Sequence, residues 1–344
     1  MTYPFRNLIF EGGGVKGIAY VGAMKVLGKQ EILKNISRVG GTSAGSINAV
    51  LFAAGFTNQE THHVLNTLDF NDFKDDSWGA LRDMNRLKNE YGWYKGDFFR
   101  EWIGDLLKKK TGSSNITFKA LKEFSGKELY VYASNVSTNF GEVYSPEHTP
   151  RMRVVDAIRR SMSIPLFFRA LQDDRKDIIV DGGVINNYPV KLFDREKYLE
   201  NTSLKRIPNY YKEENKALST KSPKSSSYIY NKETLGFRLD SAKEIGVFRD
   251  GQEPQHNEIN HFLDYTIQLI NTILAVQNSQ HLHEDDWHRT VYIDTLGVAT
   301  TDFGLSDNLK KELVVSGKKA AEDYLEWWSD ESQDLAINHP ASTD

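Results

Sequence analysis

The segment Gly41-Thr42-Ser43-Ala44-Gly45 places a serine between two glycines, after a short apolar stretch and before a run of small residues. Flanking glycines allow the tight strand-to-helix turn that exposes a nucleophilic hydroxyl. The following helix directs its free N–H groups and dipole toward the oxygen that becomes negative during acyl transfer. The pattern therefore predicts that Ser43 is the nucleophile of a serine acyl hydrolase. A glycine–serine turn that only caps a helix is the alternative.

The glycine-rich segment Gly12-Gly13-Gly14-Val15-Lys16-Gly17 also follows an apolar stretch. Closely spaced glycines expose several backbone N–H groups in one concavity, which can hold a dinucleotide pyrophosphate or an oxyanion. Where a ribose-binding acid is expected, Glu31 ends no predicted strand. An oxyanion hole accounts for this loop and for Ser43 together, and a nucleotide- or phosphate-binding module remains the alternative.

The tripeptide Asp181-Gly182-Gly183 follows the predicted strand Asp177–Val180. The carboxyl ends of parallel strands form the ligand-binding edge of an α/β sheet, so we expect Asp181 at the same edge as Ser43. A carboxylate there can serve as the base for the serine if burial raises its pKa. Alone, such a tripeptide is typical of a turn.

Histidine is the usual partner of a catalytic serine, and in many α/β hydrolases it follows the last strand. His281 and His283 instead close a predicted helix beside two aspartates, and His288 precedes a predicted strand. We therefore predict a Ser43–Asp181 dyad without histidine. The His281-x-His283 pair lacks neighbouring ligands at metal-site spacing, so neither a metal nor another cofactor is expected.

Elements that would position these residues alternate between strand and helix. A strand, a glycine turn and a helix occur twice within the first 55 residues, which favours an α/β fold with a parallel sheet. The predicted strands are Asn7–Phe10, Ser37–Gly40, Glu128–Val136, Asp177–Val180, Leu235–Leu239 and Thr290–Ile293. The predicted helices include Ile18–Leu27, Ala44–Ala54, Met152–Met162, Ile259–Gln280 and Leu309–Trp328. The apolar stripe within Phe98–Leu107 predicts either core packing or a lid that contacts lipid.

Residues 194–232 are rich in Lys, Ser, Asn and Tyr and poor in aliphatic residues, which predicts a mobile surface insertion. Its basic residues either remain solvated or meet anionic lipid head groups. Because predicted strands lie on both sides of it, we expect one domain over residues 5–328. The polar residues 329–344 are expected to form a disordered tail.

The chain has 344 residues, no cysteine and a net charge of −4. The lack of cysteine excludes disulfides, thiolate catalysis and cysteine-ligated zinc. The charge gives no support to nucleic-acid binding. The first residues lack the pattern of a signal peptide, and no window of 18 uncharged apolar residues occurs, so we expect a cytoplasmic protein with at most peripheral membrane contact.

In order and spacing, these motifs resemble the patatin-like phospholipase family over about residues 5–192. The glycine loop, the serine turn and the Asp-Gly-Gly tripeptide all match, as do Ser161–Phe168 and Asn186–Val190. Glu11 stands where the family often has aspartate, and Lys16 where it often has arginine. The resemblance is less close beyond residue 192.

The resemblance implies a three-layer α/β/α sandwich with a mostly parallel sheet. It also implies hydrolysis of the fatty acyl esters of membrane or micellar glycerolipids, with Ser43 as nucleophile and Asp181 as proton acceptor. The amides of Gly13, Gly14 and Val15 would form the oxyanion hole, framed by the motif residues Gly12, Gly17, Gly41, Gly45, Gly182 and Gly183. A protein of this fold that acts by partner binding, or that needs an activating partner, remains a further alternative.

Overall fold

The computed structural model describes residues 3–73, 86–221, 225–241, 284–300 and 302–330, together with 253, 258–260, 265, 268–269, 272–273 and 338. The strands are β1 Asn7–Phe10, β2 Arg38–Thr42, β3 Gly92–Tyr94, β4 Glu128–Asn135, β5 Phe140–Tyr144, β6 Leu166–Phe168, β7 Leu171–Gln172, β8 Ile178–Asp181, β9 Thr234–Asp240 and β10 Thr290–Asp294. The α-helices are α1 Tyr20–Lys29, α2 Ala44–Ala53, α3 Asn58–Thr67, α5 Asp97–Thr111, α6 Phe118–Ser125, α7 Val154–Ser161, α8 Gly183–Asn186, α9 Asn209–Lys221, α12 Glu284–Trp287 and α13 Asp307–Ser329. Short 3-10 helices are η1 Gly14–Ala19, η2 Ile32–Asn35, η3 Phe70–Phe73, η4 Val190–Phe193, η5 Glu196–Tyr198 and η6 Thr202–Leu204.

Within these residues the central sheet has eight strands in the order β10-β9-β1-β2-β4-β8-β7, and β5 also pairs with β4. The strands from β10 to β4 are parallel to one another. Both β5 and β8 run antiparallel to β4, and β7 runs antiparallel to β8. The mostly parallel sheet that the sequence predicts is therefore confirmed, with an antiparallel region at one edge.

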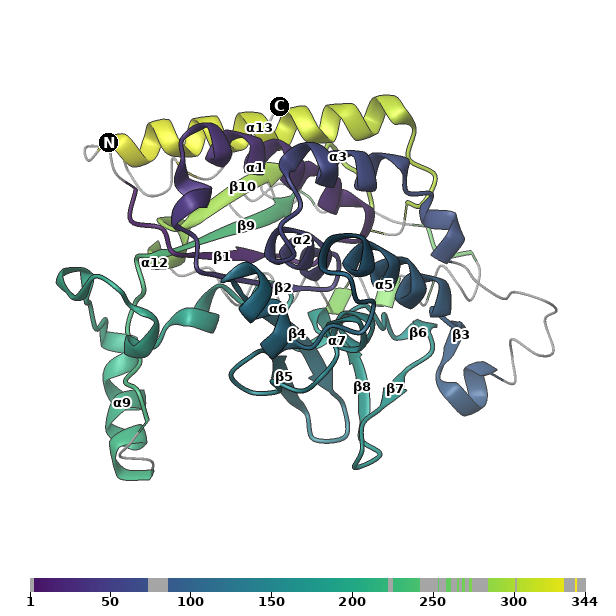
Figure 1. Ribbon diagram of the computed structural model, residues 1–344, viewed down its shortest axis with the longest axis horizontal. Coiled ribbons are helices and arrows are strands. Elements are labelled where there is room, and N and C mark those ends of the chain that lie inside the picture. Colours follow the sequence, from purple (N-terminus) through teal and green to yellow (C-terminus); the bar gives the residue numbers. More distant parts are fainter. Residues whose placement is uncertain are drawn as a thin grey trace.

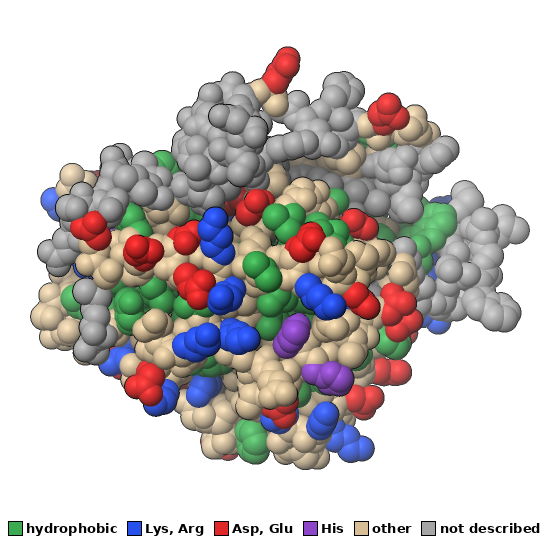
Figure 2. All heavy atoms as spheres, turned by 90° about the horizontal axis from the view of Figure 1, so that it is seen from above, with side chains coloured by type: hydrophobic (Ala, Val, Ile, Leu, Met, Phe, Trp, Pro, Cys, Tyr) green, Lys and Arg blue, Asp and Glu red, His purple; other side chains and the backbone are tan. Residues whose placement is uncertain are grey.

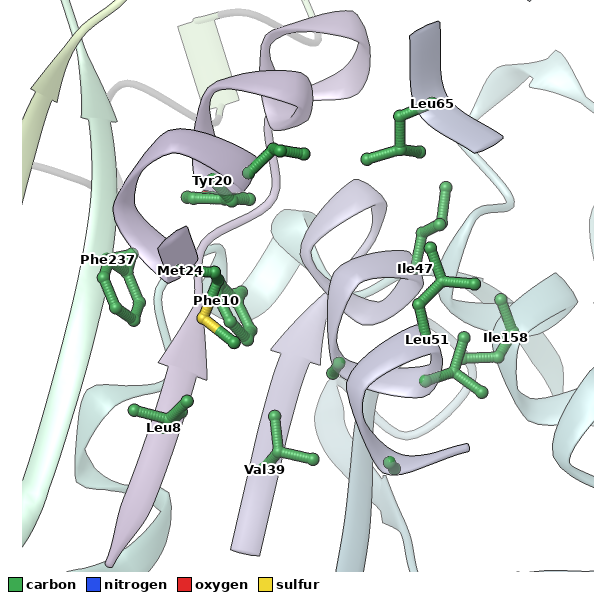
Figure 3. Packing of buried hydrophobic residues seen from close by; sticks show 14 of the residues in the cluster. Leu8, Phe10, Tyr20, Met24, Val39, Ile47, Leu51, Leu65, Ile158 and Phe237 are labelled. Carbon is green, nitrogen blue, oxygen red and sulfur yellow. The ribbon is translucent and has the colours of Figure 1, made fainter. Parts of the chain in front are cut away.

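Helices cover one face of this sheet and build the main core. Figure 1 shows α13 and α1 above the β10–β9–β1 part, with α2, α6 and α7 over the part formed by β2 and β4. Figure 3 shows Leu8 and Phe10 of β1 and Val39 of β2 on the same side of the sheet as Tyr20 of α1 and Ile47 of α2. This side-chain alternation along β1 leaves Ile9 for the opposite face.

The opposite face has a smaller core. Ile9 and Tyr130 of the sheet pack there against Val190, Phe193 and Tyr198, which come from η4 and η5. The ring of Tyr130 meets that of Phe193 edge-on, with centroids 4.9 Å apart. Layers on both faces make the fold an α/β/α sandwich, as the resemblance implies.

The strands and helices expected around the catalytic motifs all form, with end points shifted by at most two residues. The predicted helix over Ile259–Gln280 lies largely outside the described residues, and so does most of the tail 329–344. The apolar stripe on α5 packs into the core, because Phe99, Ile103 and Leu107 are buried. Core packing, and not a lid, is therefore the structural role of that stripe.

The segment predicted as an insertion contains η5, η6 and α9, and Figure 1 shows α9 projecting from the body of the molecule. Its first residue, Asp194, is buried and forms an ion pair with Arg289. Several of its basic side chains have local partners, such as Lys205 with Glu196 and Arg206 with Asp285. The mobility of this segment stays a prediction.

The face over α13, α1 and α3 carries a mixture of basic, acidic and hydrophobic side chains, as Figure 2 shows from that side. No helix within the described ranges is both long enough and apolar enough to cross a membrane.

Candidate active site

Ser43 occupies the turn between β2 and α2. Its backbone has φ 51° and ψ −130°, a conformation that residues other than glycine rarely adopt. The residue is 6% exposed. A side chain at Gly45 would meet the carbonyl oxygens of Phe10 and Glu11, so glycine there lets the turn approach the end of β1. The strained, tightly packed turn holds the Ser43 hydroxyl in the position expected of a nucleophile.

Asp181 lies beside this turn, but the strand that carries it runs in the opposite direction from the one that the sequence predicts. We expected Asp181 to end a strand parallel to that of Ser43, and this expectation is wrong, since β8 runs antiparallel to β4. β4 extends past the end of β2, and β8 pairs with this extension. Thr42 pairs with Tyr132 and Asp181 with Ala133, so Asp181 reaches the level of Ser43 from the opposite direction.

The Asp181 carboxyl is buried, with 5% of the residue exposed. Its Oδ1 accepts a hydrogen bond of 2.8 Å from the Gly183 amide, which fixes the orientation of the carboxyl. Its Oδ2 is buried and accepts no well-aligned hydrogen bond from the described residues. Burial raises the pKa of Asp181 to about 7, while the nearby Ser43 hydroxyl and the Gly183 amide each lower this pKa in part. Such a carboxyl can take up a proton near neutral pH.

The glycine loop lies against the serine turn. A Cβ added at Gly12 would stand 3.0 Å from the Cβ of Ser43, so the two segments are in direct contact. Gly12 donates its amide to the Asn187 carbonyl at 3.0 Å, and the Asn187 side-chain amide donates to the Gly12 carbonyl at 3.0 Å. Asn187 also donates to the Glu11 carboxyl at 3.2 Å. These bonds hold the start of the loop in place beside Ser43.

The end of the glycine loop is held by a second segment. The Val15 amide donates to the Thr300 carbonyl at 3.3 Å. Gly14 has φ +55°, and a side chain there would collide with the same carbonyl. Participation of the Val15 amide in an oxyanion hole therefore requires the bond to Thr300 to open, whereas Gly13 and Gly14 donate to no backbone carbonyl within the described residues.

Two residues next to Ser43 were not singled out by the catalytic motifs. The Ser43 amide donates to the Ser161 hydroxyl at 2.8 Å, and that hydroxyl donates to the Tyr132 carbonyl at 2.6 Å. The Ser43 Oγ lies 3.6 Å from the sulfur of Met162. Both residues fall in the stretch Ser161–Phe168 that resembles the family, but only the structure shows what they contact.

Histidine does not contact Ser43 or Asp181 within the described residues. His288 precedes β10, at the amino end of the parallel strands, while Ser43 follows the carboxyl end of β2. Its ring packs against Trp327 and Trp328, and burial lowers its pKa to about 4. His281 and His283 lie outside the described residues.

Comparisons with known proteins identify the family and the fold of this chain. The family model described as "Patatin-like phospholipase" matches residues 8–194, more than half of the chain. The uncharacterized protein YqhO of Bacillus subtilis (strain 168) is 28% identical over 335 residues, which cover 93% of this chain and 98% of that protein. A probable lipid hydrolase, 463L of Invertebrate iridescent virus 6, is 27% identical over 188 residues, 55% of this chain and 63% of that protein.

Among solved structures, VipD from Legionella pneumophila aligns with a TM-score of 0.55 and 16% sequence identity, over 94% of this chain and 67% of that chain. At this level of identity the likeness concerns the fold. The family match spans the glycine loop, the serine turn and the Asp-Gly-Gly tripeptide, which the fold brings together. The chain belongs to the patatin-like phospholipase family and is a lipid hydrolase.

Proposed function

We propose that the chain is a phospholipase A-type hydrolase that cleaves fatty acyl esters of glycerolipids through a Ser43–Asp181 dyad. The observation that carries this proposal is the strained Ser43 turn beside a buried carboxyl whose pKa is raised to about 7. The family, and a viral relative described as a probable lipid hydrolase, support the substrate class.

The cycle has two steps. Asp181 takes the hydroxyl proton as the Ser43 Oγ attacks the ester carbonyl carbon, and the electron pair of the C=O bond moves to the oxygen. When the tetrahedral intermediate collapses, the ester C–O bond breaks and the departing lyso-lipid takes the proton from Asp181. Water then loses a proton to Asp181 and attacks the acyl-enzyme, and the proton returns to Ser43 as the fatty acid leaves.

The amides of the glycine loop would stabilise the oxyanion in both steps. Each donor in such a hole typically contributes about 10²–10³ in rate. Gly13 and Gly14 are the first candidates, and Val15 joins them only when its bond to Thr300 opens. The bond between Val15 and Thr300 therefore favours a form of the enzyme in which the oxyanion hole is incomplete. An activating partner would act by opening this bond.

The test combines a covalent fluorophosphonate probe with mass spectrometry of products from a panel of phospholipids and neutral lipids. We expect the probe to label Ser43, and we expect Ser43→Ala and Asp181→Asn to lower fatty-acid release by roughly 10³-fold or more. Asp177→Asn is the matched control, because Asp177 immediately precedes β8 and is partly exposed. Substantial turnover by folded Ser43→Ala would refute the mechanism, and labelling only after addition of cell lysate would indicate an activated enzyme.

A nucleotide-binding role for the glycine loop has less support. The amides of Gly12 and Val15 are already bonded to carbonyl oxygens, which leaves fewer donors for a pyrophosphate. Nucleotide binding that persists in Ser43→Ala, with no esterase activity in the unaltered protein, would favour that role instead.

A further inference from the structure

A groove of about 950 Å³ lies between α7 and the strands β5 and β7. Seven arginines and five carboxylates line it, with no lysine or histidine. The groove shares α7 with the candidate active site, because α7 ends at Ser161. Its strand β7 pairs with β8, which ends at Asp181. Figure 1 shows α7, β5 and β7 at the opposite end of the sheet from α13.

Carboxylates neutralise several of these arginines and fix their side chains. Arg100 donates two hydrogen bonds to Asp156, of 3.0 Å and 2.9 Å. Arg153 pairs with the same aspartate. On the other wall, Arg175 pairs with Asp173 at 3.2 Å. These pairs define the shape of the groove but leave little net charge.

Two other arginines of the groove have no carboxylate partner among the described residues. Arg151 is exposed and makes no hydrogen bond or ion pair there. Arg160 donates to the Tyr144 hydroxyl at 3.3 Å, and its guanidinium stands 5.4 Å from the centre of the Tyr144 ring. The Tyr144 hydroxyl in turn donates to the Glu142 carboxylate at 2.7 Å. An arginine that is held in place without a direct carboxylate partner is suited to bind phosphate, because its planar N–H groups match phosphate oxygens.

An exposed aromatic side chain lies on the same strand as two residues that line the groove. Phe140, at the start of β5, is 73% exposed. Side chains alternate along a strand, so Phe140 lies on the same face of β5 as Glu142 and Tyr144, which line the groove. Val136, in the turn that leads into β5, is 41% exposed.

The turn that carries Phe140 is braced by the neighbouring hairpin. The Val136 amide donates to the Ile178 carbonyl at 3.0 Å, and the Ile178 amide donates to the Ser137 hydroxyl at 2.9 Å. The exposed apolar residues therefore stand on a supported hairpin whose second strand, β5, lines the groove. Basic side chains beside exposed aromatic and aliphatic ones are typical of surfaces that bind anionic membranes.

We propose that this groove binds the phosphate of an anionic phospholipid head group in a membrane, with Phe140 at the membrane interface. Arg151 and Arg160 supply positive charge that no direct ion pair with a described residue neutralises, and Tyr144 holds Arg160 in place. The inference rests on the proposed function in one respect, since a glycerolipid hydrolase must reach a lipid surface. The surface is an anionic membrane, and the negative charge of its head groups is required for binding.

Vesicle co-sedimentation in the Ser43→Ala background tests the proposal without consuming the lipid. The probes are vesicles of phosphatidylcholine alone and of phosphatidylcholine with phosphatidylglycerol. We expect Arg151→Ala/Arg160→Gln to weaken binding to the phosphatidylglycerol vesicles by roughly ten- to thirty-fold, with little change for phosphatidylcholine alone. Added salt should weaken binding by the unaltered groove. Phe140→Ser should weaken binding to both kinds of vesicle.

Two matched controls separate the groove from the rest of the surface. Lys212→Ala/Lys216→Gln removes two exposed charges from α9 in the segment 194–232, and Phe124→Ser removes an aromatic residue that is 54% exposed on α6. Neither should change binding. Anionic-vesicle binding that is unaffected in the groove variants, or lost in the α9 control instead, would overturn the proposal.

Soluble inorganic phosphate distinguishes a head group from a free anion. If millimolar phosphate binds through Arg151 and Arg160 while vesicle binding is insensitive to both, the groove is a site for a free anion and the membrane proposal fails. Hydrolysis of a soluble short-chain ester should be unchanged in the arginine variants, so loss of vesicle binding and failure of the Ser43 mechanism are separate results.

Discussion

In the Ser43–Asp181 dyad that we propose, ionisation of the buried Asp181 carboxyl sets the pH range in which Ser43 can react. Asp181 accepts a proton only when ionised, and its pKa is raised to about 7. We therefore expect kcat/KM for a soluble ester to rise with pH until about 7 and to level off above it. A pH–rate profile checks this, and an ascending limb centred near pH 4 would show that the carboxyl titrates as an exposed one does.

Because its pKa is raised, the ionised form of Asp181 destabilises the folded state. The folded state holds the proton more tightly than the unfolded chain, so stability is fully present below pH ~4 and falls as pH rises through about 7. Asp181→Asn should raise the free energy of unfolding above pH ~7 by about 1–3 kcal/mol, and the gain should vanish below pH ~4. Urea denaturation at both pH values measures it. A variant that is less stable than the unaltered protein in the alkaline range would contradict it.

Ser161 is expected to act on Ser43 through position alone. Its hydroxyl joins the Ser43 amide to the Tyr132 carbonyl, and Ser161→Ala leaves both groups without that partner. We expect a stability loss of about 1–3 kcal/mol. Turnover should fall by roughly tenfold, with retained fluorophosphonate labelling, because the nucleophile remains but its turn is less well held. Unchanged turnover in a destabilised variant would limit Ser161 to a structural role.

At the scale of elements, the sequence predicts which strands and helices form, but it does not always predict the direction of a strand in the sheet. Glycine patterns and apolar stretches predict β1, β2 and the helices that follow them, because these signals are local. β8 pairs antiparallel with the part of β4 that extends beyond the end of β2. This arrangement depends on segments that are far apart in the sequence. The contacts of Asn187 and Thr300 with the glycine loop are equally non-local, so no pattern within the loop could reveal them.

The glycine loop and the Thr300 segment should respond together to substitution. Gly14→Ala adds a side chain at a positive φ and into the Thr300 carbonyl. Gly126→Ala is the matched control, since Gly126 has φ +73° with no atom within 4 Å of an added Cβ. The control should lose about 1 kcal/mol from backbone strain alone, and Gly14→Ala should lose more, together with most esterase activity. Equal losses in the two variants would mean that the loop can move away from Thr300 without penalty.

At the scale of the whole molecule, a buried ion cluster joins segments that are far apart in the sequence. Arg289, which precedes β10, donates two hydrogen bonds to Asp194, of 2.5 Å and 2.8 Å, and two to Asp286, of 3.2 Å and 2.8 Å. Arg289→Ala would leave Asp194 buried without its charge partner, so we expect a stability loss of about 3–5 kcal/mol. Arg206→Ala, which removes a half-exposed arginine, should cost below ~1 kcal/mol. Denaturation measures the stability of both variants. Similar losses of stability would show that the buried Arg289 ion pair contributes no more than an exposed one.

The family match ends at residue 194, yet we propose that residues 5–328 form one domain. β1 is a central strand whose two neighbours are β2 and β9, and β9 lies beyond residue 194. α13 packs against α1 so closely that a side chain at Gly22 or Gly317 would collide with the backbone of the other helix or of the turn before it. A fragment that ends at residue 194 would expose both the β9 side of β1 and the α13 side of α1.

We therefore expect residues 1–194, expressed alone, to lack fixed tertiary structure although they carry Ser43, Asp181 and the whole glycine loop. Apolar surface that is buried in the full chain would be open to water, at a cost of about 25 cal/mol for each Å². Near-ultraviolet circular dichroism and fluorophosphonate labelling should both be lost in the fragment, whereas the full chain should unfold in a single cooperative transition. A folded, labelled fragment would divide the chain into two units and would limit the catalytic domain to the family match. The loss of labelling in a folded fragment would instead assign the segments after residue 194 a direct part in the site, with Thr300 as the first residue to examine.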